Sequence, residues 1–524
     1  MKYSLPEDRK LKLKDGVDLI SRVWKPKSIG PWPALLMRQP YGRAIGSTVT
    51  YPHPEWWSQK GYLVVIQDVR GLGDSQGKFT GFDQEASDTS ETHNWVRSLP
   101  ECNGKIGTYG FSYQGLSQLI ATKGTKAPDC MVPAMTGLDE CNHWSCDGNA
   151  FWWHLGISWG LQLAALKARK EENKEVWNLL RNSLTDGSYL KDGHLLLEKH
   201  DPEGMAYKWF SKSNKTSAEW TIHEPLKEWL KQPILLIGGW WDPHLNGIID
   251  IYKRSIKAGG KPELHIGPAT HLEWWDGVHE LQLRFFNKHL KDSDEGENTG
   301  QKGKLWNIST KEWQDIKNRS ASIQSWGLKS QGLACAEINE GSLNPVEKGS
   351  GLIQLVHDPW RPVPSRGGHL GPEAGLVDRE NLDKRCDVAC FTSSPFKSRT
   401  EFEGYPVLEL EVISDQDGFD LCIALSVINE NQSRVTQIST GFQRILGSEP
   451  FSPIRKKVIL QPILFEVKTN ERIRLSIAGS AWPAIGVNPG NSLKGVAGPE
   501  KHCNIITQTI NLNNSKFQIL PFFN

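Results

Sequence analysis

The sequence predicts an α/β domain with a helical insertion, followed by an all-β domain. Over residues 1–134 and 231–295, short apolar runs alternate with helical segments, as in a parallel sheet covered by helices. Residues 135–230 contain no such run and carry apolar residues at helical spacing, which predicts a helical cap. From 305 to 524, apolar and polar residues alternate between turn signals, a pattern typical of a β-sandwich or jelly roll.

The strands of the α/β domain are predicted from compact apolar runs. A parallel strand reads as a continuous apolar run because both of its faces are covered. Helical segments at 83–98, 116–123 and 277–290 lie between or after these runs. The predicted strands are Pro33–Met37, Tyr62–Ile66, Lys105–Tyr109, Pro233–Ile237 and Pro262–Ile266.

The insertion and the C-terminal part follow other patterns. Helices are predicted over His154–Lys170 and Val176–Leu184 in the cap. Lys291–Lys304 is polar and rich in Asp, Glu and Gly, and it is predicted to be a linker. Beyond it, Tyr405–Val412 and Asp420–Val427 alternate apolar and polar residues, as half-buried strands do.

Composition and charge exclude several classes of function. Lys plus Arg number 61 against 60 for Asp plus Glu, so no general field attracts nucleic acid or an anionic membrane. No apolar stretch approaches the roughly 18 residues of a membrane span, and the first residues lack a secretion signal. The nine cysteines include no CxxC pair. We therefore expect a cytoplasmic protein with free thiols.

Ser112 lies in a segment that has the pattern of a nucleophile turn. The strand Lys105–Tyr109 runs into GFSYQG, residues 110–115, and a helix is predicted to follow. Small neighbours permit the sharp turn that exposes a serine hydroxyl, and the backbone N–H of Tyr113 would face an oxyanion. Gln114 stands where the G-x-S-x-G pattern has its second glycine. A serine between glycines is often a plain turn residue, so this segment alone leaves function open.

Two further strand ends supply an acid and a base. Pro233–Ile237 leads through GGWW to Asp242, and Pro262–Ile266 leads through GPAT to His271. The order Ser, acid, His along the chain is that of α/β-hydrolases. We therefore predict a triad in which His271 takes the proton of Ser112 and Asp242 orients the imidazole. Ser112 then forms an acyl-enzyme that water releases.

Other histidines and acids near these strands fit structural roles better. His265 lies within an apolar strand, and Asp68 precedes Ser112, which is the wrong order for an acid of this fold. The remaining candidates lie on helices, at a helix start or directly beside Asp242: His279, Asp250, Asp276 and His244. No His, Asp and Glu cluster has metal-ligand spacing, so no metal and no cofactor are expected.

Tyr41 is the candidate for a second oxyanion donor. It follows the strand Pro33–Met37, and a phenol donates a hydrogen bond while staying neutral at pH 7. Candidates for a substrate pocket come from the tryptophans of the cap and the acid loop, although helix packing explains the cap members equally well. They are Trp144, Trp152, Trp153, Trp159 and Trp241. Carboxylates that would hold a substrate amine, or be ordinary surface charges, are Asp139, Glu140 and Glu273.

Together these residues resemble the family of cocaine esterase and the X-Pro dipeptidyl-peptidases, which includes α-amino-acid ester hydrolases and glutaryl acylases. The family's nucleophile turn reads G-x-S-Y-x-G, and GFSYQG matches it, so Gln114 agrees with the pattern. The segment DVRG at 68–71 resembles the family's D-x-R-G signature. By this resemblance Tyr41, Asp242 and His271 fall at the oxyanion, acid and base positions. The resemblance implies an α/β-hydrolase domain, an inserted helical cap and a C-terminal jelly roll.

The function that the resemblance implies is hydrolysis of an ester or amide through an acyl-enzyme on Ser112. We prefer an esterase; a dipeptidyl-peptidase or α-amino-acid ester hydrolase that recognises a free amine is the alternative. A different class of function is an inactive protein whose jelly roll binds carbohydrate. The expected partner is a small ester, amide or short peptide, and an oligomer is possible. The glycines at 71–77 lack the G-x-G-x-x-G spacing, which excludes nucleotide binding.

Overall fold

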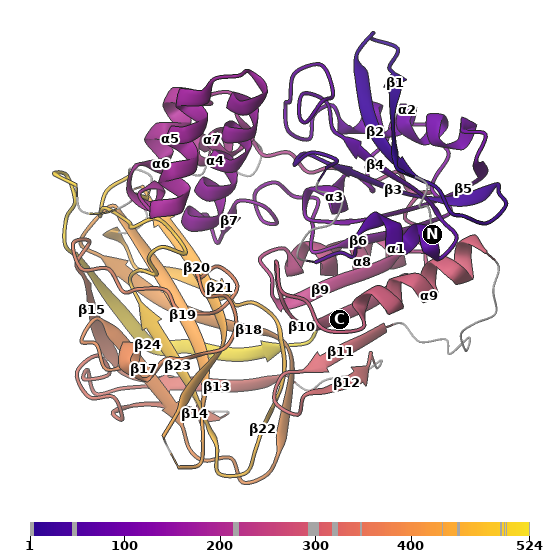
Figure 1. Cartoon of the computed structure of the whole chain (residues 1–524). Helices are drawn as coiled ribbons and strands as arrows, with labels where there is room; N and C mark the ends of the chain where they lie inside the picture. Colours follow the sequence, from indigo (N-terminus) through magenta and orange to yellow (C-terminus); the bar gives the residue numbers. More distant parts are fainter. Residues whose placement is uncertain are drawn as a thin grey trace.

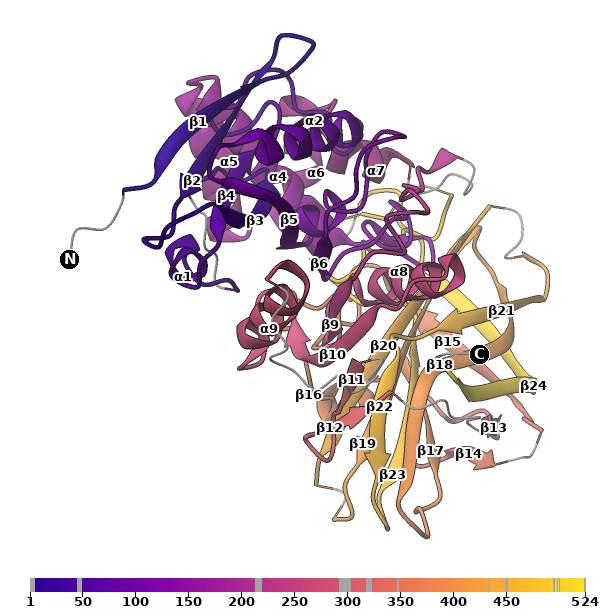
Figure 2. The same ribbon diagram turned by 90° about the vertical axis from the view of Figure 1, so that its right-hand side faces the viewer.

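The computed structural model consists of an α/β domain, a helical cap and a β domain (Figures 1 and 2). It describes residues 5–44, 50–212, 219–291, 303–316, 323–345, 348–431, 433–447, 451–492, 495–496, 498 and 500–522. In Figure 1 the α/β domain lies at the upper right and the β domain at the lower left, and the cap helices lie above the β domain and beside the α/β domain. The fold class predicted from the sequence is confirmed.

The α/β domain is built on a ten-stranded sheet with the strand order β1-β2-β4-β3-β5-β6-β9-β10-β11-β12. The strands from β4 to β11 are parallel, and β1, β2 and β12 are antiparallel to their neighbours. The carboxyl ends of the parallel strands therefore meet at one edge of the sheet, where ligands bind in open α/β sheets. The strands are β1 (Glu7–Lys12), β2 (Asp18–Trp24), β3 (Trp32–Gln39), β4 (Leu63–Asp68), β5 (Cys102–Phe111), β6 (Cys130–Ala134), β9 (Leu235–Trp241), β10 (Glu263–Thr270), β11 (Gly303–Asn307) and β12 (Glu312–Asp315).

Helices cover both faces of this sheet. The helices α1 (Pro54–Gln59) and α9 (Val278–Leu290) pack on one face, where Trp57 and Phe286 meet Leu35 and Ile237. On the other face α2 (Glu85–Ser98) packs on β3, and α8 (Leu245–Ala258) packs on β9. The strands between these layers are buried on both sides, which is why they read as continuous apolar runs.

The prediction of a helix over residues 116–123 is wrong. The structure has a four-residue helix, α3 (Tyr113–Leu116), and the chain then turns. The reason is the side chain of Gln118, whose amide donates to the carbonyl oxygens of Gly110 and Gln114 at 3.1 and 3.0 Å. Such side-chain bonds to the backbone compete with continuation of a helix.

The cap lies between β6 and β9 and is mostly helical. A two-residue hairpin, β7 (Cys146–Asp147) with β8 (Ala150–Phe151), precedes its helices. The sequence indicated the first two helices and did not indicate the last two. The first helix begins one residue earlier than predicted, and the second extends two residues further at each end. The helices are α4 (Trp153–Lys170), α5 (Lys174–Asp186), α6 (Tyr189–His200) and α7 (Met205–Lys212).

The β domain has twelve strands in one connected sheet system, in the described residues from Gln324 onward. The predicted strands at 405–412 and 420–427 lie within β18 and β19. The elements are β13 (Gln324–Lys329), β14 (Gly341–Pro345), β15 (Leu352–His357), β16 (Val377–Asp378), α10 (Glu380–Asp383), β17 (Val388–Ser393), β18 (Thr400–Ser414), β19 (Gly418–Ile428), β20 (Val435–Leu446), β21 (Ile454–Ile459), β22 (Ile463–Val467), β23 (Arg472–Ala478) and β24 (Ile506–Leu520).

The first sheet extends further along the chain than the sequence indicated. β11 and β12 fall at the start of the region expected to be the β domain, yet β11 pairs with β10 and β12 pairs with β11. Most of the linker predicted at Lys291–Lys304 lies outside the described residues, and its last two residues begin β11. The sheet therefore continues to Asp315 before the β domain begins.

The β domain contacts both other parts close to the sheet edge. Gln461, between β21 and β22, donates its side-chain amide to the carbonyl oxygen of Asp242 at 2.7 Å. The backbone N–H of Trp153, the first residue of α4, donates to the carbonyl oxygen of Ala484 at 3.0 Å. These bonds fix the cap and the acid loop against the β domain. No helix in the described part of the chain is long and apolar enough to cross a membrane.

Candidate active site

Ser112 sits on a strained turn between β5 and α3. Its backbone has φ 59° and ψ −127°, a conformation that a non-glycine residue adopts only when its surroundings enforce it. The N–H of Ser112 donates to the carbonyl oxygens of Ala134 and Met135 at 3.0 and 3.1 Å, which holds the turn. The turn also requires glycine on each side: a Cβ at Gly110 would lie 2.4 Å from the Cβ of Gln114. The strand-to-helix turn predicted from the sequence is present.

Gln114 has a structural role at the position where the strict motif has glycine. Its side chain is buried. Its amide oxygen accepts from the N–H of Phe111 at 3.3 Å, and its amide nitrogen donates to Gln39 at 3.2 Å. Gln39 ends β3, so Gln114 joins the Ser112 turn to the neighbouring strand.

Asp242 and His271 form a hydrogen bond at the ends of two paired strands. The parallel register of β9 and β10 sets Trp241 beside Thr270, so the next residue on each strand is the acid or the histidine. The Nδ1 of His271 donates to Oδ1 of Asp242 at 2.6 Å. Asp242 is fully buried, and the ring of Phe111, beside Ser112, lies 5.1 Å from the ring of His271. The structure thus brings the three predicted residues to one edge of the sheet.

His244 is a neighbour of this pair that the sequence argument set aside. Its backbone N–H donates to Oδ2 of Asp242 at 3.0 Å, and its ring lies 5.0 Å from that of His271. Burial lowers the pKa of His244 to about 4, so its imidazole is neutral near pH 7. Ligand atoms of Asp242, His244 and His271 lie within 4.8 Å of one another. The sequence showed no metal-ligand spacing because His271 joins this cluster only through folding.

Tyr41 lies after β3, as predicted, and contacts the cap. Its hydroxyl oxygen accepts a hydrogen bond from the indole N–H of Trp159 on α4 at 3.0 Å. Burial raises the pKa of Tyr41 to about 12, so the phenol keeps its proton at neutral pH. The sequence made Trp159 a pocket candidate, but its bond to Tyr41 was not predicted, because the two residues lie 118 positions apart in the chain.

Tyr113 begins α3, so its backbone N–H has no acceptor within the helix. Its side chain points away into the core, where the hydroxyl contacts Glu85 at 2.9 Å and the carbonyl oxygen of Gly81 at 3.0 Å. Arg38 pairs with the same carboxylate, and both side chains are buried. The tyrosine side chain therefore anchors the turn while its backbone N–H remains available beside Ser112.

The other four candidate pocket tryptophans occupy different surroundings. Trp144 and Trp152 pack on the ring of His244, at centroid distances of 4.5 and 5.6 Å. Trp153 lies in the interior of the cap, where its indole N–H donates to the carbonyl oxygen of Leu190, so its contacts do not support a role in binding. The indole N–H of Trp241 is buried and has no hydrogen-bond partner among the described residues.

The carboxylates considered for amine binding are used elsewhere or exposed. The two oxygens of Glu140 accept from the indole N–H of Trp209 at 2.9 Å and from His223 at 3.0 Å. Asp139 accepts from the backbone N–H of Cys141 at 2.9 Å, as in a local turn. Glu273 is exposed on the loop after His271. None of the three presents a buried, unpaired carboxylate.

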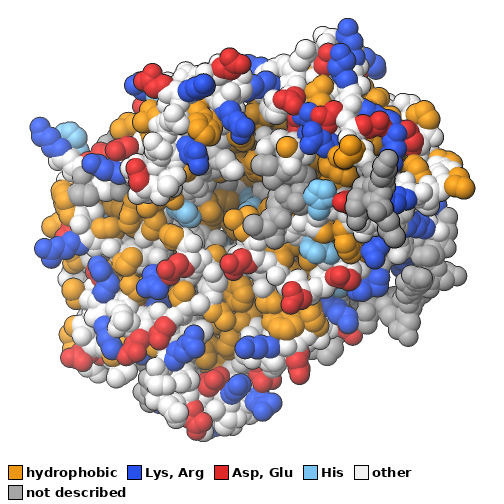
Figure 3. Space-filling view, in the orientation of Figure 1, with side chains coloured by type: hydrophobic (Ala, Val, Ile, Leu, Met, Phe, Trp, Pro, Cys, Tyr) orange, Lys and Arg blue, Asp and Glu red, His pale blue; other side chains and the backbone are white. Residues whose placement is uncertain are grey.

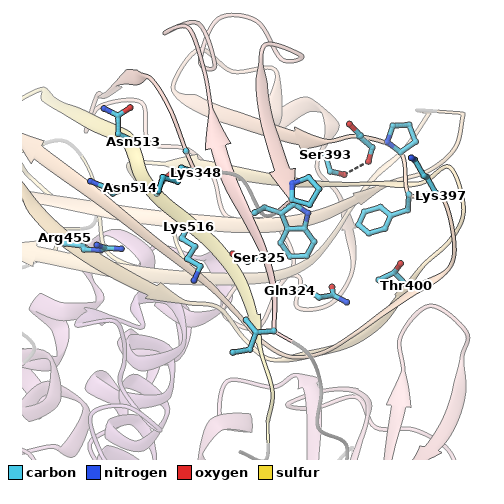
Figure 4. Close-up of a pocket in the computed structure, with 18 residues that line it drawn as sticks. Gln324, Ser325, Lys348, Ser393, Lys397, Thr400, Arg455, Asn513, Asn514 and Lys516 are labelled. Carbon is cyan, nitrogen blue, oxygen red and sulfur yellow. Dashed lines mark hydrogen bonds between the residues drawn. The ribbon is translucent and has the colours of Figure 1, made fainter.

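The face of the molecule in Figure 3 is hollowed where the cap meets the other two parts, and hydrophobic and histidine side chains lie around the hollow. A different groove of about 900 Å³ lies in the β domain (Figure 4). Lys397 lies on one side of it and Lys516 and Arg455 on the other. The groove shares no lining residue with the Ser112 site, so it is a separate feature.

Comparison with known proteins identifies the family. A family model described as X-Pro dipeptidyl-peptidase (S15 family) matches residues 15–273. A model of the X-Pro dipeptidyl-peptidase C-terminal non-catalytic domain matches residues 292–516. The chain belongs to the S15 family. As a member of this family it is a hydrolase, and the family resemblance drawn from the sequence is confirmed.

A known relative of this S15-family hydrolase is an esterase, and solved structures of an ester hydrolase and an aminopeptidase are similar to it. Cocaine esterase of Rhodococcus sp. (strain MB1 Bresler) is 24% identical over 444 residues, covering 77% of this chain and 76% of the esterase. A solved α-amino acid ester hydrolase superposes with a TM-score of 0.73 at 19% identity, covering 98% and 96% of the two chains. An aminopeptidase from the archaeon Thaumarchaeota archaeon gives 0.71 at 17% identity, covering 98% and 96%. These structures share the fold of this chain.

Proposed function

We propose that this S15-family hydrolase is a serine esterase that works through an acyl-enzyme on Ser112. The observation that carries the proposal is the 2.6 Å hydrogen bond between Asp242 and His271, next to the strained turn of Ser112. Serine hydrolases need a nucleophile, a base and an acid that orients the base. The three residues supply these groups from three strand ends of one sheet.

In the proposed mechanism, Ser112 Oγ attacks the carbonyl carbon of the substrate while Nε2 of His271 takes the hydroxyl proton. Asp242 accepts the bond from Nδ1 of His271, so it fixes the tautomer that leaves Nε2 free and stabilises the imidazolium. The tetrahedral oxyanion accepts hydrogen bonds from the hydroxyl of Tyr41 and the N–H of Tyr113. His271 then gives its proton to the leaving alcohol, and water activated by His271 releases the acyl group.

An ester substrate is favoured over an amine-bearing peptide by the state of the nearby carboxylates. A dipeptidyl-peptidase or α-amino-acid ester hydrolase must hold a substrate ammonium, and this needs an unpaired carboxylate close to the nucleophile. Glu140 is already bonded to Trp209 and His223, and Asp139 is used in a turn. The relation to cocaine esterase also supports an ester substrate.

The proposal is tested by hydrolysis rates on short-chain p-nitrophenyl esters, amino-acid esters and X-Pro anilides. We expect the simple esters to have the highest kcat/KM. Ser112→Ala abolishes turnover in this account, and Asp242→Asn lowers kcat by about 10⁴-fold because the imidazole takes the wrong tautomer. Ser117→Ala, another buried serine of the same region, is the matched control and keeps its activity.

The two alternatives give different results in the same assay. Anilide turnover comparable to ester turnover would show a dipeptidyl-peptidase in place of an esterase. A protein that hydrolyses none of the substrates and is not labelled by a fluorophosphonate would be an inactive binding protein. Full activity of Ser112→Ala would contradict the assignment of the nucleophile.

A further inference from the structure

His244, Asp242 and His271 form a three-residue cluster at the end of β9 and β10. One ligand atom from each side chain lies within 4.8 Å of the other two. In a tetrahedral zinc site with bonds of about 2.1 Å, neighbouring ligand atoms lie roughly 3.4 Å apart. The cluster therefore needs only rotations of its side chains to surround one ion.

The orientation of the His244 ring also suits a metal ligand. Its Nδ1 contacts the carbonyl oxygen of His143 at 2.6 Å, and a carbonyl oxygen only accepts, so Nδ1 carries the hydrogen. The lone pair of this ring is consequently on Nε2, which accepts no hydrogen bond from the described residues. A ring N–H bonded to a backbone carbonyl is the usual support of a histidine that binds a metal through its other nitrogen.

We propose that Asp242, His244 and His271 form an inhibitory site for Zn²⁺ or a similar borderline metal ion. Imidazole nitrogens and a carboxylate oxygen suit zinc, and water would take the fourth position. Ca²⁺ and Mg²⁺ prefer sets of oxygen ligands and would bind weakly here. The inhibitory effect rests on the proposed function, whereas binding of the ion does not.

Inhibition follows because the ion would bind Nδ1 of His271. Nδ1 of His271 now holds a proton that it shares with Asp242. When the ion takes that nitrogen, the proton moves by way of water to Nε2 of the same ring, and no net proton is lost. Nε2 then has no lone pair to accept the Ser112 proton. The ion also separates His271 from Asp242, so the base loses its orientation.

Binding is tested first on Ser112→Ala protein, which needs no catalytic activity. Zn²⁺ is titrated in competition with a chromogenic chelator at pH 7.5. We expect one ion per chain, and at least tenfold weaker binding when H244F or H244Q is added to Ser112→Ala, because a ligand is lost. Circular dichroism of each variant checks that it is folded, and the two substitutions differ in size and polarity, so one of them serves if the other misfolds.

Inhibition is then measured on protein with Ser112 intact. Zn²⁺ should inhibit ester hydrolysis, EDTA should restore it, and Mg²⁺ should have no effect. The half-inhibiting concentration, taken relative to the metal-free rate of each variant, should rise at least tenfold in H244F and H244Q. Two matched controls keep the wild-type sensitivity: His279→Gln removes a half-buried histidine of α9, and Cys386→Ser removes an exposed thiol.

Unchanged zinc binding in both His244 variants would overturn the proposal, as would loss of binding in Cys386→Ser. A protein that binds zinc through His244 but has no ester hydrolysis would keep the metal site and contradict the proposed function. A protein that hydrolyses esters and is not inhibited by zinc would support the proposed function and contradict the inhibitory metal site.

Discussion

The indole N–H of Trp159 donates a hydrogen bond of 3.0 Å to the hydroxyl oxygen of Tyr41. A phenol has one hydrogen, and this bond uses its oxygen as acceptor, so the hydrogen remains to be donated elsewhere. No acceptor for it is present among the described residues. Trp159 is on the first long helix of the cap, so the cap orients a donor at the edge of the sheet. In the proposed mechanism that donor serves the oxyanion.

Trp159→Phe tests this coupling. The variant keeps an aromatic ring in the stack with Trp144 and Trp209 but lacks the N–H. We expect kcat to fall about tenfold with KM little changed, since loss of an entire oxyanion donor costs about 10²–10³-fold. Tyr41→Phe should cause the larger loss, and the double variant should be no worse than Tyr41→Phe alone.

The matched control for this prediction is Trp209→Phe. It shortens a tryptophan of the same stack whose N–H bonds to Glu140 and not to Tyr41. Equal losses of kcat in Trp159→Phe and Trp209→Phe, or additive losses with Tyr41→Phe, would show that Trp159 acts only through packing of the cap.

Gln461 links the β domain to the acid loop. Its amide donates to the buried carbonyl oxygen of Asp242 at 2.7 Å. Gln461→Ala leaves that carbonyl without its partner, which costs about 1–3 kcal/mol of stability. We expect kcat to fall as well, because the backbone that carries Asp242 loses a restraint. Urea unfolding and ester kinetics measure the two effects; unchanged kcat would show that the β domain does not position the acid.

Gly110 is required by both space and backbone angle. Its φ is 139°, and an added Cβ would lie 2.4 Å from the Cβ of Gln114. Gly110→Ala should destabilise the protein by about 2–4 kcal/mol, from strain and overpacking together. Gly104→Ala is the control, since Gly104 has φ 89° but open space around it. If thermal unfolding shows the same loss for both variants, packing of the turn is not the cause.

Stability should fall as the pH drops below about 6.5, in part because of His93. This histidine is buried and stacks on Trp229 at 5.5 Å, and burial lowers its pKa to about 3. Below its ordinary pKa the unfolded chain takes up a proton that the folded protein does not. The free energy of unfolding therefore decreases by up to about 1.4 kcal/mol per pH unit from this group, until the pH reaches the folded pKa.

His93→Phe keeps a ring on Trp229 and removes the titrating group. Urea unfolding of both proteins at pH 7.5 and 5.5 measures the difference, and the variant should lose less stability over this range. The same pH dependence in the two proteins would mean that His93 is not kept neutral by the fold.

The parts of the site that the sequence predicted are those fixed by single strands. Ser112, Asp242 and His271 each follow a buried parallel strand, and such strands are visible as apolar runs. The parallel arrangement then brings their ends together. The early end of α3 was not predicted, because the side-chain bonds of Gln118 end a helix that the residue pattern favoured.

The parts that the sequence did not predict depend on contacts between distant segments. Gln461 reaches Asp242 across 219 residues, and Trp159 reaches Tyr41 across 118. Nothing in the local pattern of either residue indicates its partner. In the same way, β11 and β12 lie at the start of the region expected to be the β domain, and only the pairing of β11 with β10 and of β12 with β11 assigns them to the first sheet.

Covalent labelling is the most direct test of whether Ser112 is the nucleophile. The protein is treated with a fluorophosphonate, digested and analysed by mass spectrometry. We expect one adduct, on the peptide that contains Ser112, with labelling abolished in Ser112→Ala and greatly slowed in His271→Ala. An adduct on a different residue, or continued ester hydrolysis by fully labelled protein, would contradict this assignment.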